Sequence, residues 1–129
     1  MKKRYKVLII IVIIVLVIGV AGKLIIDKIE RDMEAVMLIE IEDVDLSTIS
    51  DGVYLGSYKS VPIEVHVKVT ITNHIITDIE ITKHVTGQGQ GAEIIIDDIL
   101  EEQSLDVDLI SGATYSSKII LLAIKDALS

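Results

Sequence analysis

The feature that most constrains this chain is an uninterrupted apolar run near its N-terminus. Residues 7–22 read VLIIIVIIVLVIGVAG and contain no charged side chain. Lys23 can snorkel along its aliphatic stem, so the run extends to residue 26 and matches the roughly 20 residues that a helix needs to cross a hydrocarbon core. The run is apolar on every face, which disfavours the core helix of a soluble domain. The sequence therefore predicts a transmembrane anchor over residues 7–26.

The flanks of the run predict its orientation. Four basic residues and no acidic residue precede it: Lys2, Lys3, Arg4 and Lys6. Because positive charge favours the cytoplasmic side, we expect residues 1–6 in the cytoplasm and the domain beyond the anchor on the outer side of the cell membrane. A cleaved signal peptide is the alternative, since residues 19–21 (GVA) resemble a cleavage site with small residues.

Beyond Lys6 the chain is strongly acidic. Four of its 12 basic residues precede the apolar run, so the remaining 8 face 20 acidic residues. Such a surface repels nucleic acid and anionic lipid, and we expect neither as a ligand. Cysteine is absent, which excludes disulfides, thiolate metal sites and lipid attachment through cysteine. The sequence places His66 on a solvent-facing strand position, His74 in a turn and His84 by itself, so we expect no metal site.

The remaining residues predict a linker and one folded domain. Residues 27–50 continue the helical spacing and then alternate, which predicts an amphipathic stalk followed by an edge strand or a solvated linker. Residues 51–129 predict the domain. Apolar and polar residues alternate over 62–73, as in a half-buried strand, with shorter strand signals at 51–60.

A hairpin and two helices complete the predicted domain. Asn73 and His74 form a plausible tight turn, after which residues 74–85 return as the partner strand. Ile75, Ile79 and Ile81 are expected to face inward. Helices are predicted over 91–104, with Ile94, Ile95, Ile99 and Leu100 on the apolar side, and from about 114 to 128. Strands first and helices afterwards indicate an α+β fold, an antiparallel β-meander covered by helices.

The segment from Asp108 to Ser117, DLISGATYSS, places several hydroxyls at the start of the last predicted helix. Helix capping by Ser111 or Thr114 is one explanation. Attachment of a phosphate group is another, because a helix N-terminus offers unpaired N–H groups and the positive end of the dipole. Gly112 would allow a close approach of the backbone. The residues alone leave both explanations open.

Five landmarks, taken in order, resemble the FMN-binding domain family over residues 51–128. This family includes subunits of the sodium-translocating NADH:quinone reductase and of its ferredoxin-linked relatives. The landmarks are an Asp-Gly-x-Tyr-x-Gly strand at 51–56, His84 with the Gly-rich loop 87–91, Ala92-Glu93, Gln103-Ser104, and Asp-x-x-Ser-Gly-Ala-Thr at 108–114. Members often have His-x-Glu-Thr-Pro-Gly in the loop, whereas this chain has His-Val-Thr-Gly-Gln, which leaves the role of the loop in holding the flavin open.

The resemblance implies FMN as the cofactor and Thr114 as its attachment point. The bond would be a phosphoester, installed from FAD by a magnesium-dependent flavin transferase. The transferase would recognise Asp108, Ser111, Gly112 and Ala113. Tyr115 adjoins the attachment point and would contact the flavin ring, and His84 with Gly87 and Gly89 would lie near the flavin.

The function that the resemblance implies is electron transport by a membrane-anchored flavoprotein outside the cytoplasm. The chain is better described as a carrier than as an enzyme with its own substrate, because redox chemistry belongs to the cofactor. Its partners would be the transferase and membrane-bound or extracytoplasmic redox proteins. Two alternatives are a membrane-tethered interaction subunit without flavin and a sensor that binds FMN noncovalently.

Overall fold

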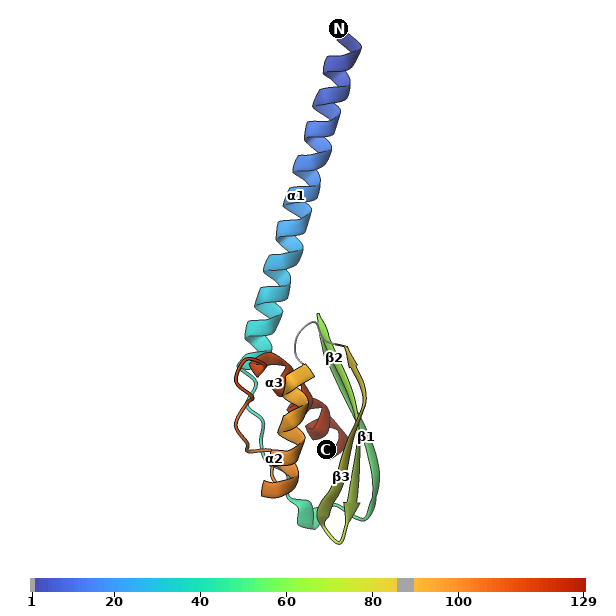
Figure 1. The fold of residues 1–129 in the computed structure, drawn as a ribbon, viewed down its shortest axis with the longest axis vertical. Coiled ribbons are helices and arrows are strands. Elements are labelled where there is room, and N and C mark those ends of the chain that lie inside the picture. The colour runs from blue at the N-terminus through green and yellow to red at the C-terminus, as the bar shows by residue number, and fades with distance from the viewer. Residues whose placement is uncertain (1, 86–89) are drawn as a thin grey trace. The chain divides into compact units, whose positions relative to one another are not determined.

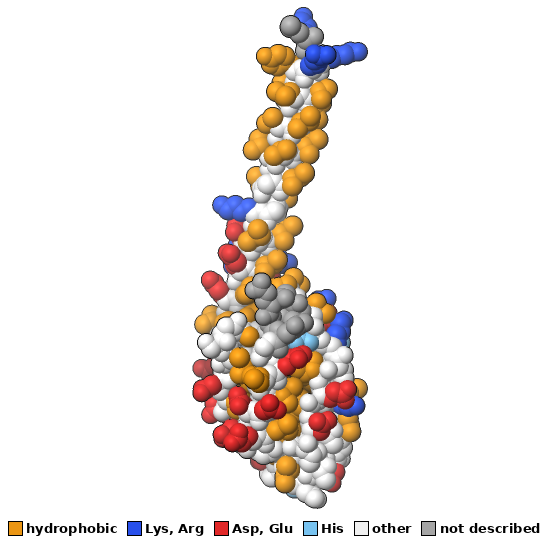
Figure 2. Space-filling view, viewed as in Figure 1, with side chains coloured by type: hydrophobic (Ala, Val, Ile, Leu, Met, Phe, Trp, Pro, Cys, Tyr) orange, Lys and Arg blue, Asp and Glu red, His pale blue; other side chains and the backbone are white. Residues whose placement is uncertain are grey.

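The computed structural model describes residues 2–85 and 90–129, and the chain forms two compact units, Met1–Asp32 and Met33–Ser129. The first unit consists of most of helix α1 (Lys2–Met37). Its apolar side chains are exposed, and they cover the face of the helix that Figure 2 shows. Among the described residues, α1 is the one helix that is long and apolar enough to span a membrane. None of its apolar stretch is buried. The finding supports the predicted anchor.

The segment from residue 38 to residue 51 forms a linker. It contains a short 3₁₀ helix, η1 (Leu46–Thr48), and no strand, so the edge-strand alternative is wrong for these residues. Asp43 fastens the linker to the domain: its carboxylate accepts hydrogen bonds from Ser104 Oγ at 2.6 Å and from the Leu105 N–H at 2.9 Å. Partial burial raises the pKa of Asp43, but these hydrogen bonds outweigh it and hold the pKa below its usual value.

Three antiparallel strands form a meander in the order β1-β2-β3, as predicted. They are β1 (Gly52–Ser60), β2 (Ile63–Thr72) and β3 (Ile75–Val85). Side chains along β2 alternate between buried and half-buried up to Ile71, as its period-two pattern requires. At the hairpin, Asn73 and His74 both have positive φ, of 52° and 61°, and Asp51 Oδ1 accepts a hydrogen bond from the Asn73 N–H at 2.7 Å.

A register shift in the second hairpin corrects one prediction about the core. Ile75 is 50% exposed, whereas Ile76 is buried at 2%. Ile76 pairs with Ile71, but the next pair is Asp78 with Thr70, so Thr77 is the extra residue of a β-bulge. Because the bulge shifts the alternation by one residue, Ile76 and Ile79 are both buried although they are three residues apart. Ile81 is half-buried.

The two helices that follow the strands in the chain cover the same face of the sheet (Figure 1). A 3₁₀ turn, η2 (Gln90–Ile94), leads into α2 (Ile95–Glu102), and the chain ends in α3 (Thr114–Ala127). Helix α3 packs on β1 and β2, while α2 packs beside β3. The α+β prediction is confirmed. Within it, Ile94 is 61% exposed, contrary to expectation, because it belongs to the 3₁₀ turn that precedes α2 rather than to its apolar side.

Gln103 and Gly56 explain why two of the sequence landmarks occur where they do. Gln103 ends α2 with a left-handed conformation, and its side-chain amide bonds both the N–H and the carbonyl of Ile76, at 2.8 and 2.9 Å. Gly56 lies where β1 meets α3. A Cβ at this position would lie 2.5 Å from the Ala127 nitrogen, so only glycine permits the close packing.

Candidate functional site

The candidate site is built around the turn that opens α3. Gly112 has φ +79°, a conformation that favours glycine, and Ala113 is the N-cap residue. Ala113 has no hydroxyl, and within residues 2–85 and 90–129 no side-chain hydrogen bond caps this end of the helix. The capping explanation for Ser111 and Thr114 is therefore wrong. Both side chains are exposed, and Thr114 is the first residue of the helix.

Ser117 is a residue whose role the sequence reasoning missed. Its side chain is fully buried, and its Oγ donates a hydrogen bond to the Ala113 carbonyl at 2.8 Å and accepts one from the Ile110 N–H at 3.1 Å. These two bonds close the turn between Ile110 and Ala113. The signal was present in the sequence, because a serine four residues after a carbonyl on a helix can bond back to it.

An apolar groove lies directly beside Thr114. We call it the Thr114 groove; it has a volume of about 580 Å³, and its lining residues all belong to the second unit: Met33, Glu34, Met37, Leu38, Thr114 and Tyr115. The last turn of α1 forms one wall and the first turn of α3 the other. Tyr115 is held by its phenol O–H, which donates to the Ser60 carbonyl at 3.3 Å.

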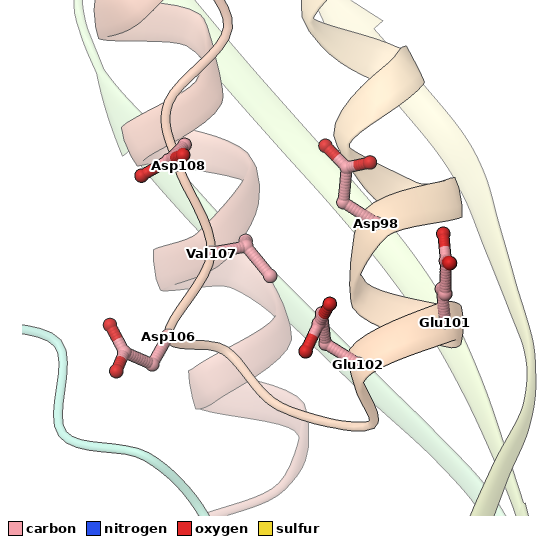
Figure 3. A pocket seen from close by; sticks show the side chains of 6 residues that line it. All are labelled: Asp98, Glu101, Glu102, Asp106, Val107 and Asp108. Atoms are coloured by element: carbon pink, nitrogen blue, oxygen red, sulfur yellow. The ribbon is translucent and has the colours of Figure 1, made fainter.

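A second hollow, the acidic pocket, lies between α2 and the loop that leads to α3. It has a volume of about 290 Å³ and is lined by Asp98, Glu101, Glu102, Asp106, Val107 and Asp108. Figure 3 shows Val107 pointing from the loop toward α2, with Glu102 opposite it. Acidic side chains gather on this part of the surface (Figure 2). The structure thus places Asp108 in the acidic pocket, whereas Thr114 and Tyr115 line the groove.

The three histidines occupy three separate environments. His66 lies on the outer face of the sheet, with Nε2 2.8 Å from Glu64 Oε1. His74 Nδ1 lies 3.1 and 3.0 Å from the carbonyls of Leu46 and Ile49, so Nδ1 carries a proton and donates to both. Across residues 2–85 and 90–129, no group of three or more potential ligand side chains is placed to hold a metal ion.

His84 differs from the other two because its side chain is only 5% exposed. Nδ1 lies 3.1 Å from Glu93 Oε1, which brings together two of the landmarks, and Nε2 is buried without a hydrogen-bond partner among the described residues. Such an orphaned polar atom is uncommon in a folded protein and suggests a missing ligand or water. Glu93 belongs to η2, which packs against α3. Gly87 and Gly89 lie outside the described residues.

The part of the chain that contains His84, Asp108 and Thr114 matches a known protein family. The family model described as the FMN-binding domain matches residues 59–129, more than half of the chain. The match includes His84, Asp108 and the whole turn that opens α3, and it confirms the resemblance inferred from the landmarks. No curated protein matches the chain significantly.

Proposed function

The chain belongs to the FMN-binding domain family, and we propose that it is a membrane-anchored electron carrier in which Thr114 holds FMN through a phosphoester bond. FMN is the cofactor that the family match indicates. The proposal adds three elements to it: the covalent bond, the transfer of electrons between partners, and a position of the domain outside the cytoplasm.

The observation that carries the proposal is the placement of the Thr114 hydroxyl. It is exposed at the first position of a long helix, where backbone N–H groups lack intrahelical partners and can bind phosphate oxygens. The same residue lines an apolar groove. FMN combines a phosphate with a flat, largely apolar ring, so both of its ends match features beside Thr114.

The buried Nε2 of His84 adds a second point of fit. A polar atom that lacks a partner in the described part of the chain is available to a bound group, and η2, which holds the other side of the imidazole, packs against α3. The residues present thus fit FMN. When bound, FMN supplies one- and two-electron transfer, and the protein supplies position and electrostatic field.

Attachment requires that Thr114 Oγ1 lose its proton and form a bond to phosphorus. Thr114 Oγ1 would attack the FMN phosphorus of FAD, forming the new ester as the bond to the AMP portion breaks. The hydroxyl proton is lost, and AMP leaves. The mass of the chain therefore rises by one FMN less one water.

Intact mass measured after co-expression with a flavin transferase tests this proposal. Thr114→Ala should lose the increment completely, and Thr114→Ser should keep at least part of it. Ser116→Ala is the control, because Ser116 is 5% exposed and unable to reach a phosphate. The site is wrongly assigned if Thr114→Ala still gains the mass. A wild-type chain that never gains it would instead support a noncovalent FMN sensor or an interaction subunit.

The location of the domain is tested separately. The basic residues before the anchor favour a cytoplasmic N-terminus, so protease added to spheroplasts should digest the domain and spare a tag at residue 1. Complete protection of the domain would reject this orientation without affecting the assignment of Thr114.

A further inference from the structure

We propose that the Thr114 groove binds the isoalloxazine ring, so that the last turn of α1 forms part of the flavin site. This inference rests on the proposed attachment to Thr114, because that bond would bring the ring to the groove. It assigns a binding role to Met33, Met37 and Leu38, which lie outside the segment matched by the family model.

The chemistry of the lining fits a flat aromatic ring. Methionine sulfur makes favourable contacts with aromatic rings, and tyrosine can stack on them with an offset. The groove, at about 580 Å³, falls within the range of about 300–1,000 Å³ that is typical of small-molecule sites. A short covalent tether would also hold the ring at a high local concentration, so modest contacts would suffice to place it.

The groove is preformed because both of its walls are fastened to the domain. Val36, between the two methionines, is buried at 6% and belongs to the domain core. One turn further on, Lys118 Nζ of α3 donates a hydrogen bond to the Ile39 carbonyl. The last turn of α1 is thus tied to the first turns of α3. A site that needs no rearrangement loses less binding free energy to ordering.

Charge distinguishes the groove from the acidic pocket as a site for the ring. A flavin gains electrons on reduction, and neighbouring carboxylates oppose the added negative charge. The acidic pocket is lined by five carboxylates, whereas the groove has one, that of Glu34. Reduction would therefore be easier in the groove. Glu34→Gln should shift the midpoint potential of the bound flavin to more positive values.

The test compares two leucines of similar exposure in the full-length, flavinylated chain in detergent micelles. Leu38 is 82% exposed in the groove, and Leu55 is 74% exposed on β1, away from it. Quenching of flavin fluorescence by acrylamide reports how open the ring is to solvent. An open groove would cover one face of the ring, so complete loss of that cover would raise the quenching constant roughly twofold, and Leu38→Gln should raise it toward that limit. Met37→Gln should do the same, and Leu55→Gln should leave the constant unchanged.

Intact mass measured on the same samples separates the two proposals. Full labelling with equal quenching in all three variants would overturn the groove and leave the attachment intact. If the wild-type chain is never labelled, the attachment fails, and the same variants are titrated with free FMN. Weaker binding in Leu38→Gln and Met37→Gln, but not in Leu55→Gln, would still support the groove. Equal binding, or none, would reject it.

Discussion

Two hollows flank the segment from Leu105 to Tyr115, and they differ in almost every physical respect. The acidic pocket is lined by five carboxylates that repel one another, whereas the Thr114 groove is lined mainly by apolar side chains and has one carboxylate, that of Glu34. One short motif contributes to both, with Asp108 in the pocket and Thr114 in the groove. Residues that are close in sequence can thus serve different surfaces, because a turn separates them.

Removing the Ser117 hydroxyl should have the largest effect, because it closes that turn. Ser117→Ala leaves the Ile110 N–H without its partner, and we expect the free energy of unfolding to fall by about 1–3 kcal/mol. The labelled fraction should fall too, since Thr114 would no longer be held at an ordered helix start. Urea denaturation and intact mass measure the two effects.

Ser116→Ala is the matched control for this prediction. Ser116 is also buried and lies in the same helix turn, but no side-chain hydrogen bond fixes it among the described residues. Equal losses in the two variants would show that burial, and not the bridge from Ile110 to Ala113, accounts for the role of Ser117.

A side chain at Gly112 should have the next largest effect. Its φ of +79° is unfavourable for a β-branched residue, and Gly112→Val should cost about 1–2 kcal/mol and reduce labelling. Apart from Gly112 and its two chain neighbours, no heavy atom of the described residues lies within 4 Å of the position that the Cβ would occupy, so the penalty comes from the backbone and not from crowding. Gly91 also has open space but no such φ, and Gly91→Val should be milder in a thermal melt. Equal destabilisation would contradict the backbone explanation.

The smallest effect is expected from neutralising carboxylates in the acidic pocket. Glu102 follows Asp98 by four residues on α2, so Glu102→Gln removes a like-charge pair and should stabilise the fold by about 0.2–0.5 kcal/mol without changing labelling. Asp108→Asn also removes a negative charge from the acidic pocket. Because Asp108 belongs to the family motif, we expect this substitution to reduce recognition by the transferase as well. Initial labelling rates compare the two. Equal rates would mean that the transferase does not read Asp108.

Local patterns in the sequence were sufficient to predict the main helices and strands of this fold and their order. The apolar run predicted α1, alternation predicted β2, and Asn73-His74 predicted the hairpin turn, because each depends on side chains that are neighbours in the chain. The motif at 108–114 also located the candidate attachment site, because all of its residues lie within one short segment of the chain. They are Asp108, Ser111, Gly112, Ala113 and Thr114.

Contacts between distant segments were decided only by the tertiary structure. The bulge at Thr77 exchanged Ile75 for Ile76 in the core, which the alternation within β3 does not encode. The pairing of His84 with Glu93, and the meeting of Met33 and Met37 with Thr114, depend on how strands and helices pack. Periodicity records which side of an element is apolar, but it carries no information about which other element that side will meet. The sequence by itself therefore identified the proposed point of attachment, and packing decided what surrounds it.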